Sequence, residues 1–292
     1  MRRAILTTAT LALAMTACAE SAPTGPGDET IEHPTDPASP ILVVRFEGGF
    51  VPAEYLFTSL PTFALYGDGT LIEPGGQIEI YPGPALPAIG ERTIAEDGIQ
   101  AILRAAKDAG LDRDGDYSDL GNMGIADAAT TVFELTVDDT THRVSAYALG
   151  MEESRQEGQP DDVWAMREAL VAFQTQLGAL DGLVPPGSIG ETNTYQGAAA
   201  QLLVRPYRPD PELPQEPVDW PLAVSLADAG TPVPMVGDDA ECLVVSGEDW
   251  IALRALAERA NQLTPWRQDG ARFAIAFRPL LPDEQVCRYG MD

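Results

Sequence analysis

The sequence predicts an α+β fold in which antiparallel sheets carry helices on one side, followed by a small disulfide-bridged C-terminal section. Three observations predict this class. Short runs rich in β-branched and aromatic residues are bounded by turn residues, longer segments carry apolar residues at helical spacing, and the two kinds alternate as strand-strand-helix units. Hydrophobic residues make up 45% of the 292 residues, which allows a core and excludes a wholly disordered chain.

The clearest strand signal is a hairpin around Gly67-Asp68-Gly69, because glycine readily adopts the positive φ angles of tight turns. Three consecutive alanines at residues 198–200 leave a helix possible in one of the other segments. Strands are expected at residues 41–46, 63–66, 70–72, 77–81, 130–137, 142–149, 192–204, 222–226, 242–245 and 271–277.

Helices are expected at residues 93–110, at residues 162–177 and from Ser246 onward. Each has apolar residues on one side at helical spacing. Thr93 and Glu96 have the spacing of a capping box at the start of the first helix, and Ser246 and Asp249 repeat that spacing in the third.

Proline-rich stretches divide the chain. They flank the segments with regular apolar patterns, and prolines without a periodic apolar pattern are typical of linkers. The sequence therefore predicts a signal peptide (1–17), a lipid anchor and disordered linker (18–40), a main α+β domain (41–205), a Pro-rich connector (206–221) and a C-terminal α+β section (222–292).

The N-terminus has the composition of a bacterial export signal. Arg2 and Arg3 precede an apolar stretch at residues 4–14 that is too short to span a bilayer. The following residues, Met15-Thr16-Ala17-Cys18, resemble the lipobox of bacterial lipoproteins, in which the cysteine is diacylated and becomes the mature N-terminus. This resemblance implies a lipid anchor at Cys18 and a location on the extracytoplasmic side of the cell membrane. Ordinary cleavage after Ala19, giving a secreted or periplasmic protein, is the alternative.

Two cysteines besides Cys18 lie in the C-terminal section. Export places Cys242 and Cys287 in an oxidising compartment, where an even pair of thiols is usually a disulfide. A Cys242–Cys287 bridge is therefore expected, with two buried free thiols as the alternative.

The chain is strongly acidic, with 45 Asp and Glu against 18 Lys and Arg and a formal net charge of -27. This charge repels phosphate backbones and argues against nucleic acid as a partner. An acidic surface can also be an adaptation to salt, so charge alone identifies no partner.

One acidic segment could bind a cation. Asp112, Asp114 and Asp116 alternate along a predicted loop, and alternating carboxylates can direct several oxygens at one Ca²⁺ ion. The segment departs from the EF-hand pattern, since Tyr117 occupies the place of the turn glycine and Met123 that of the bidentate glutamate. A solvated acidic loop is the alternative, and apart from calcium we expect no cofactor.

The sequence identifies no catalytic residue. His33 and His142 are the only histidines, too few for a typical zinc site, and serine-hydrolase, P-loop and dinucleotide signatures are absent. The 45 carboxylates leave open a hydrolase that acts through a carboxylate pair.

Three segments together resemble an uncharacterised family of exported bacterial lipoproteins. They are Phe63-Ala64-Leu65-Tyr66-Gly67-Asp68-Gly69, Asp127-Ala128-Ala129-Thr130-Thr131-Val132-Phe133 with His142-Arg143-Val144-Ser145-Ala146-Tyr147-Ala148-Leu149-Gly150, and Arg278-Pro279-Leu280-Leu281-Pro282-Asp283-Glu284 before Cys287. The resemblance covers about residues 41–287. It implies an exported lipoprotein and adds no activity. We therefore expect a membrane-anchored, non-catalytic protein that binds an envelope protein or another ligand, with a carboxylate hydrolase as the alternative.

Overall fold

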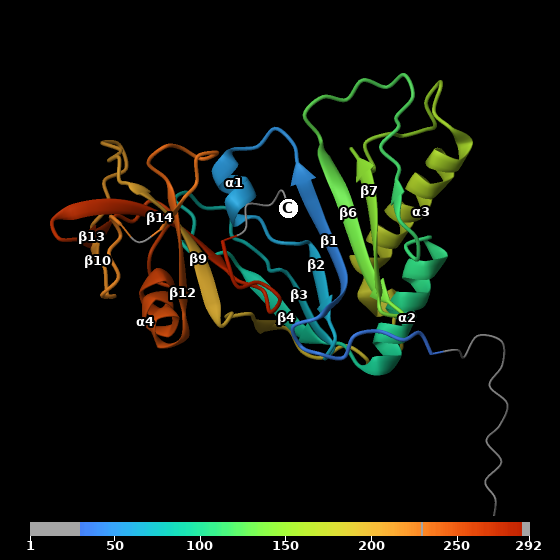
Figure 1. Ribbon diagram of the computed structural model, residues 1–292, viewed down its shortest axis with the longest axis horizontal. Coiled ribbons are helices and arrows are strands. Elements are labelled where there is room, and N and C mark those ends of the chain that lie inside the picture. The colour runs from blue at the N-terminus through green and yellow to red at the C-terminus, as the bar shows by residue number, and fades with distance from the viewer. Residues whose placement is uncertain (1–29, 229, 288–292) are drawn as a thin grey trace, which may run out of the picture. The chain divides into compact units, whose positions relative to one another are not determined.

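The computed structural model describes residues 30–228 and 230–287 (Figure 1). From Ile31 onward the described residues belong to one compact unit. The regular structure of these residues consists mainly of two largely antiparallel sheets and four α-helices. The predicted α+β class is therefore confirmed. No helix in the described ranges is long and apolar enough to cross a membrane.

The first sheet has eight strands. They are β1 (Pro40–Gly48), β2 (Phe63–Tyr66), β3 (Thr70–Pro74), β4 (Ile89–Thr93), β5 (Gly115–Asp116), β6 (Ala129–Val137), β7 (Thr140–Tyr147) and β8 (Asn193–Thr194). Their order is β5-β7-β6-β1-β2-β3-β4-β8, and only the β5–β7 pair is parallel among the described strands of this sheet. The hairpin expected at Gly67-Asp68-Gly69 joins β2 to β3, and Gly69 has a φ of +85°.

The second sheet has six strands. They are β9 (Ala199–Pro206), β10 (Val218–Asp219), β11 (Thr231–Pro232), β12 (Glu241–Ser246), β13 (Trp266–Gln268) and β14 (Ala271–Pro279). Their order is β10-β13-β14-β9-β12-β11. Strand β9 comes from the range 41–205 that the sequence assigns to the main domain, yet it pairs with β12 and β14 at the centre of this sheet.

Three of the four α-helices cover one face of a sheet, two on the first sheet and one on the second. The α-helices are α1 (Ala53–Thr58), α2 (Glu96–Asp108), α3 (Asp161–Leu177) and α4 (Gly247–Ala257), and a 3₁₀ turn covers Leu180–Gly182. Helices α2 and α3 lie against the first sheet and α4 lies against the second (Figure 1). Short α1 is different, because it connects β1 to β2 of the first sheet but packs on the second sheet, on the face opposite α4.

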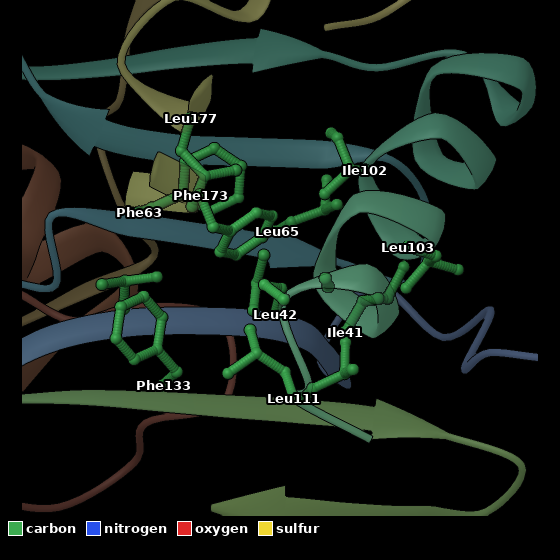
Figure 2. Close-up of a cluster of buried hydrophobic side chains, with 14 of the residues drawn as sticks. Ile41, Leu42, Phe63, Leu65, Ile102, Leu103, Leu111, Phe133, Phe173 and Leu177 are labelled. Atoms are coloured by element: carbon green, nitrogen blue, oxygen red, sulfur yellow. The ribbon is translucent and has the colours of Figure 1, made fainter. Parts of the chain in front are cut away.

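Strand alternation explains the core of the first sheet. Leu42 and Val44 of β1 point toward the helices, and Phe133 of β6 lies on the same face. There they pack with Ile102 of α2 and Phe173 of α3 (Figure 2). The rings of Phe133 and Phe173 are 6.3 Å apart, within the range of favourable aromatic pairs.

Tryptophans dominate the core of the second sheet. Trp250 of α4 and Trp266 of β13 are fully buried. Trp266 meets Trp220 edge-on at 6.0 Å and Phe277 of β14 at 5.5 Å. The indole N–H of Trp250 donates to the carbonyl of Gln196 at 3.1 Å, so its polar atom is also satisfied.

Several local expectations differ from the structure. Thr93 is the last residue of β4 and pairs with Thr70, so it does not cap α2, whose N-cap is Ala95. Ser246 is the N-cap residue of α4, but its side chain makes no capping hydrogen bond. Residues 77–81 and 222–226 form no strand. In the second segment the indole N–H of Trp220 donates to the carbonyl of Val224, which stabilises a turn instead.

Part of the expected linker belongs to the folded unit. The backbone of Ile31 exchanges two hydrogen bonds of 2.9 Å with the side chain of Gln100 on α2. The side chain of His33 is buried beside Glu96, and the carbonyl of Glu32 accepts a hydrogen bond from the backbone N–H of Asp138. These contacts attach residues 31–33 to the folded unit, although the sequence places them in the linker.

Candidate functional site

A cavity of about 250 Å³ lies between the faces of the two sheets that α2, α3 and α4 do not cover. Strand β1 contributes to both sides of the first sheet, because Val43 and Arg45 alternate with the core residues Leu42 and Val44. The lining residues come from β1, α1 and its flanks, β2, β6 and the end of β14 with the following loop: Pro40, Val43, Arg45, Phe46, Leu56, Phe57, Ser59, Leu60, Pro61, Tyr66, Glu134, Arg278, Leu281, Asp283 and Glu284.

One wall of the cavity carries a network of four charges on neighbouring strands. Arg45 donates to both carboxylate oxygens of Glu134, at 2.6 and 2.9 Å, and to Glu47 at 2.9 Å. Arg143 donates to Glu134 at 2.8 Å and to Glu47 at 2.7 Å. Each arginine therefore bridges both glutamates, which fixes the side chains of β1, β6 and β7 relative to one another.

The network keeps two of its members, Arg45 and Glu134, charged. Hydrogen bonding from Arg45 is the main cause that lowers the pKa of Glu134, and Arg143 adds to it against the effect of burial. Burial by itself would lower the pKa of Arg45, but the hydrogen bond and charge of Glu134 outweigh it and raise that pKa. Glu134 is therefore a carboxylate at neutral pH.

The facing wall carries a second, more deeply buried ion pair. Both terminal nitrogens of Arg278 donate to the carboxylate of Glu284, at 2.6 and 2.8 Å, and its Nε donates to the carbonyl of Ser59 at 2.8 Å. Glu284 also accepts from the backbone N–H of Leu281 at 2.9 Å. Arg278 thus holds the loop after β14 and the end of α1 in place together.

A tyrosine links the two walls. The hydroxyl of Tyr66 on β2 donates to Asp283 at 2.7 Å. Burial, followed by the charge of Asp283, strongly raises the pKa of Tyr66, so the phenol stays protonated. Tyr195 makes a parallel link, since its hydroxyl donates to the carbonyl of Leu280 at 2.7 Å.

Helix α1 forms the remaining wall and is attached to the second sheet. The amide of Gln201 on β9 donates to the carbonyl of Phe57 at 2.9 Å, and Arg205 pairs with Glu54. Four exposed apolar residues lie before or within α1: Phe46, Phe50, Val51 and Tyr55. Phe50 is the most exposed of them, at 86%. We call these four residues the apolar rim; Phe46 is the one of the four that lines the cavity.

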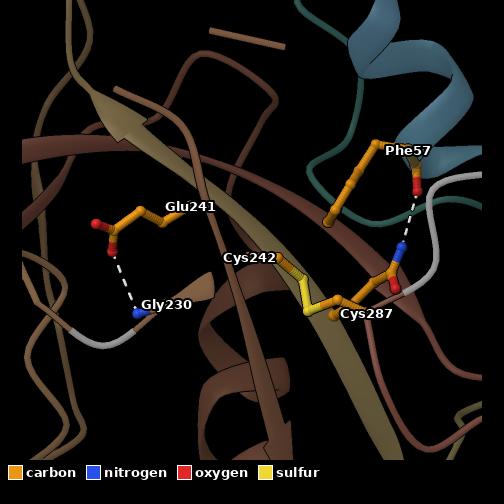
Figure 3. The surroundings of a disulfide bond; sticks show 6 residues. Phe57, Gly230, Glu241, Cys242 and Cys287 are labelled. Atoms are coloured by element: carbon orange, nitrogen blue, oxygen red, sulfur yellow. Dashed lines mark hydrogen bonds between the residues drawn. A yellow bond between two sulfur atoms is a disulfide. The ribbon is translucent and has the colours of Figure 1, made fainter. Parts of the chain in front are cut away.

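The predicted disulfide is present close to this site. Cys242 of β12 bonds to Cys287, with Cα atoms 6.2 Å apart, and Phe57 of α1 packs in the same cluster (Figure 3). The bridge attaches the segment after Glu284 to the second sheet. Cys18, the predicted lipidation site, lies outside the described residues.

The acidic loop has its own local hydrogen bonds. Asp114 accepts from the backbone of Arg143 at 2.8 Å, and Asp116 accepts from the hydroxyl of Ser118 at 2.5 Å and from Ser145 at 3.2 Å. Asp112 is exposed. In the part of the chain that the structure describes, no three His, Cys, Asp or Glu side chains gather in a way that could hold a metal ion. Calcium binding at Asp112, Asp114 and Asp116 stays a prediction.

Sequence reasoning did not find the cavity. Its charged residues come from three segments far apart in the chain and match no catalytic signature: Arg45, Glu134, and Arg278 with Asp283 and Glu284. One signal was available, since Tyr66 and Asp283 belong to two of the three segments that carry the lipoprotein resemblance. In comparisons with known proteins, no family model, curated protein or solved structure matches the chain.

Proposed function

We propose that the chain is a lipid-tethered bacterial envelope protein that binds a partner protein through the cavity and its apolar rim, without catalysing a reaction. The cavity between the two sheets is the observation that carries this proposal. The lipobox-like residues before Cys18 and the three resembling segments support the tether and the extracytoplasmic location.

The size and lining of the cavity support binding of a small group. A volume of about 250 Å³ holds about eight waters at their liquid volume. Its apolar residues include Leu56, Phe57 and Leu60, while Arg45 and Arg278 with their partners supply polar groups at defined positions. Apolar walls with a few fixed polar groups are typical of ligand sites.

The apolar rim supports a protein as the partner. Exposed aromatic residues beside a pocket are the arrangement found at the centre of many protein interfaces. Phe50 and Tyr55 are exposed, and they lie between Phe46 and Leu56 in the chain, two residues that line the cavity. We propose that a partner covers them while one of its side chains enters the pocket.

The state of the carboxylates supports binding over hydrolysis. A carboxylate pair for glycoside hydrolysis needs one member that stays protonated to act as an acid. Glu134 has a lowered pKa, and Glu284 is held by Arg278. The residues that line the cavity, all in the described ranges, include no histidine or cysteine that could act as a base or nucleophile.

Site-specific cross-linking in the native cells tests the proposal. With a photoreactive phenylalanine analogue in place of Phe50, we expect one recurrent cross-linked protein on SDS gels. The same analogue at Ile251, which is exposed on α4, is the matched control and should give no such product. Leu60→Trp, which adds bulk to the cavity wall, should reduce the Phe50 product at least about threefold if the partner enters the pocket. Equal products at both positions, or a product that L60W leaves unchanged, would contradict the proposed site.

A further inference from the structure

A second exposed apolar segment lies outside the cavity. Residues 77–81, Gln-Ile-Glu-Ile-Tyr, follow β3 and precede β4. Their composition is that of a β-strand, and the sequence predicts one. Nevertheless Ile78, Ile80 and Tyr81 are 65%, 57% and 67% exposed. Three large apolar side chains exposed within four residues are unusual on a monomer's surface.

The backbone of the segment is open to a new strand. For residues 77–81, the one backbone hydrogen bond between described residues runs locally, from the N–H of Ile80 to the carbonyl of Ile78. The remaining N–H and C=O groups have no backbone partner in the described part of the chain. An apolar segment whose backbone groups are mostly unpaired can serve as a template for strand addition once the single hydrogen-bonded turn around Glu79 opens.

Both ends of the segment are attached to the folded unit. On one side the N–H of Gly75 donates to the carbonyl of Ala88 at 2.9 Å. On the other, the carbonyl of Gly83 accepts from Gln262 at 2.9 Å, and Ala85 donates to Ala260 at 3.1 Å. Because both ends are fixed, the segment has already lost part of its conformational freedom. Binding a partner strand would therefore cost less conformational entropy.

We propose that residues 77–81 bind an extended segment of a partner protein in which basic residues alternate with apolar ones. Alternation in a strand places Ile78 and Ile80 on one side, and Gln77, Glu79 and Tyr81 on the other. A lysine or arginine opposite Glu79 would make a favourable cross-strand pair, while apolar residues would cover the isoleucines. The net charge of -27 favours a basic partner in addition.

The same charges disfavour two other occupants. When two copies pair in register, antiparallel about the middle of the segment or parallel, Glu79 stands opposite Glu79, and like charges directly opposite are destabilising. An anionic membrane surface would repel the acidic chain, and Glu79 lies between the two isoleucines that would insert. The segment shares no residue with the cavity lining or the apolar rim, so the inference is independent of the proposed function.

Two synthetic peptides provide the test. One is Thr-Val-Lys-Val-Lys-Val-Thr and the other has glutamate in place of lysine. Hydrogen exchange of the amides of residues 77–81 and fluorescence anisotropy of labelled peptide are measured on the full mature chain. We expect the lysine peptide to slow exchange at these amides and to bind at least about tenfold more tightly than the glutamate peptide.

Matched variants localise the effect. The double variant Ile78→Ser/Ile80→Ser should weaken lysine-peptide binding at least about tenfold. It should leave the fold intact, because both side chains are exposed. Ile251→Ser, which removes an equally exposed isoleucine from α4, should leave binding unchanged.

Four results would overturn the inference. The first is that the lysine peptide at millimolar concentration does not slow exchange of these amides, and the second is that both peptides bind equally. The third is protection of these amides from exchange that depends on protein concentration, together with dimers in sedimentation. The fourth is protection from exchange by phosphatidylcholine vesicles alone. The third would identify a second copy of the chain as the occupant, and the fourth a lipid surface.

Discussion

Replacing Arg278 with methionine should lower the free energy of unfolding by about 3–5 kcal/mol, since removing one member of a buried ion pair leaves the other charge buried without it. Arg278 and Glu284 are both almost completely buried. Methionine keeps the apolar stem but cannot donate to Glu284 or to the carbonyl of Ser59. The change therefore also loosens the loop after β14 and the end of α1, which line the cavity.

Chemical denaturation with the disulfide intact measures this loss, and Arg143→Met is its matched control. Arg143 also bridges two carboxylates, but it is about half exposed, so its loss should cost about 0–1 kcal/mol. The double variant Arg278→Met/Glu284→Leu should recover part of the stability lost in R278M, because no charge is then left buried at this site. A loss of less than about 1 kcal/mol for R278M would contradict the role assigned to the pair.

Removing the Cys242–Cys287 disulfide should lower the free energy of unfolding by about 4 kcal/mol. The bridge joins residues 45 positions apart, and the chain-entropy model gives about this value for a loop of that length. The double variant Cys242→Ala/Cys287→Ala avoids leaving one free thiol or a buried hydroxyl. Urea denaturation compares it with the oxidised parent chain.

Reduction of the parent chain is the control for this prediction. Treatment with a reductant should shift the denaturation midpoint as far as the double alanine variant does, and should leave that variant unchanged. A parent chain whose midpoint is the same with and without reductant would contradict the prediction. Because the bridge holds the segment that follows Glu284, we also expect faster hydrogen exchange of the Leu281 amide when it is broken.

The features that sequence predicted best depend on local pattern or simple counting. The β2–β3 hairpin follows from the glycines on either side of Asp68. Helix α3 follows from apolar residues at helical spacing, and its bounds, Asp161–Leu177, differ by one residue from those expected. The disulfide follows from an even pair of cysteines in a chain that the sequence predicts to be exported.

The features that sequence reasoning missed depend on partners distant in the chain. Thr93 has the spacing of an N-cap residue, but its backbone pairs with Thr70, which continues β4 and moves the start of α2 to Glu96. The arm that contains Ile31 reads as a linker until Gln100 of α2 pairs with its backbone. Such pairings leave no periodic signal in the segment itself.

The cavity shows the same limit at the functional level. Arg45 and Glu134 each read as an ordinary exposed charge in an alternating strand. Only the pairing of β1 with β6, and the packing of α1 on the second sheet, turn this charged face toward Arg278. Knowing the strands without their order would not have located it.

The most direct test of a tethered binding protein is mass spectrometry of the mature N-terminus, on protein cross-linked in cells and purified from its native membrane. The account predicts a chain that begins at Cys18 with a diacylglyceryl group, recovered with one recurrent partner. An unmodified N-terminus at Glu20, recovered without a partner, would contradict it.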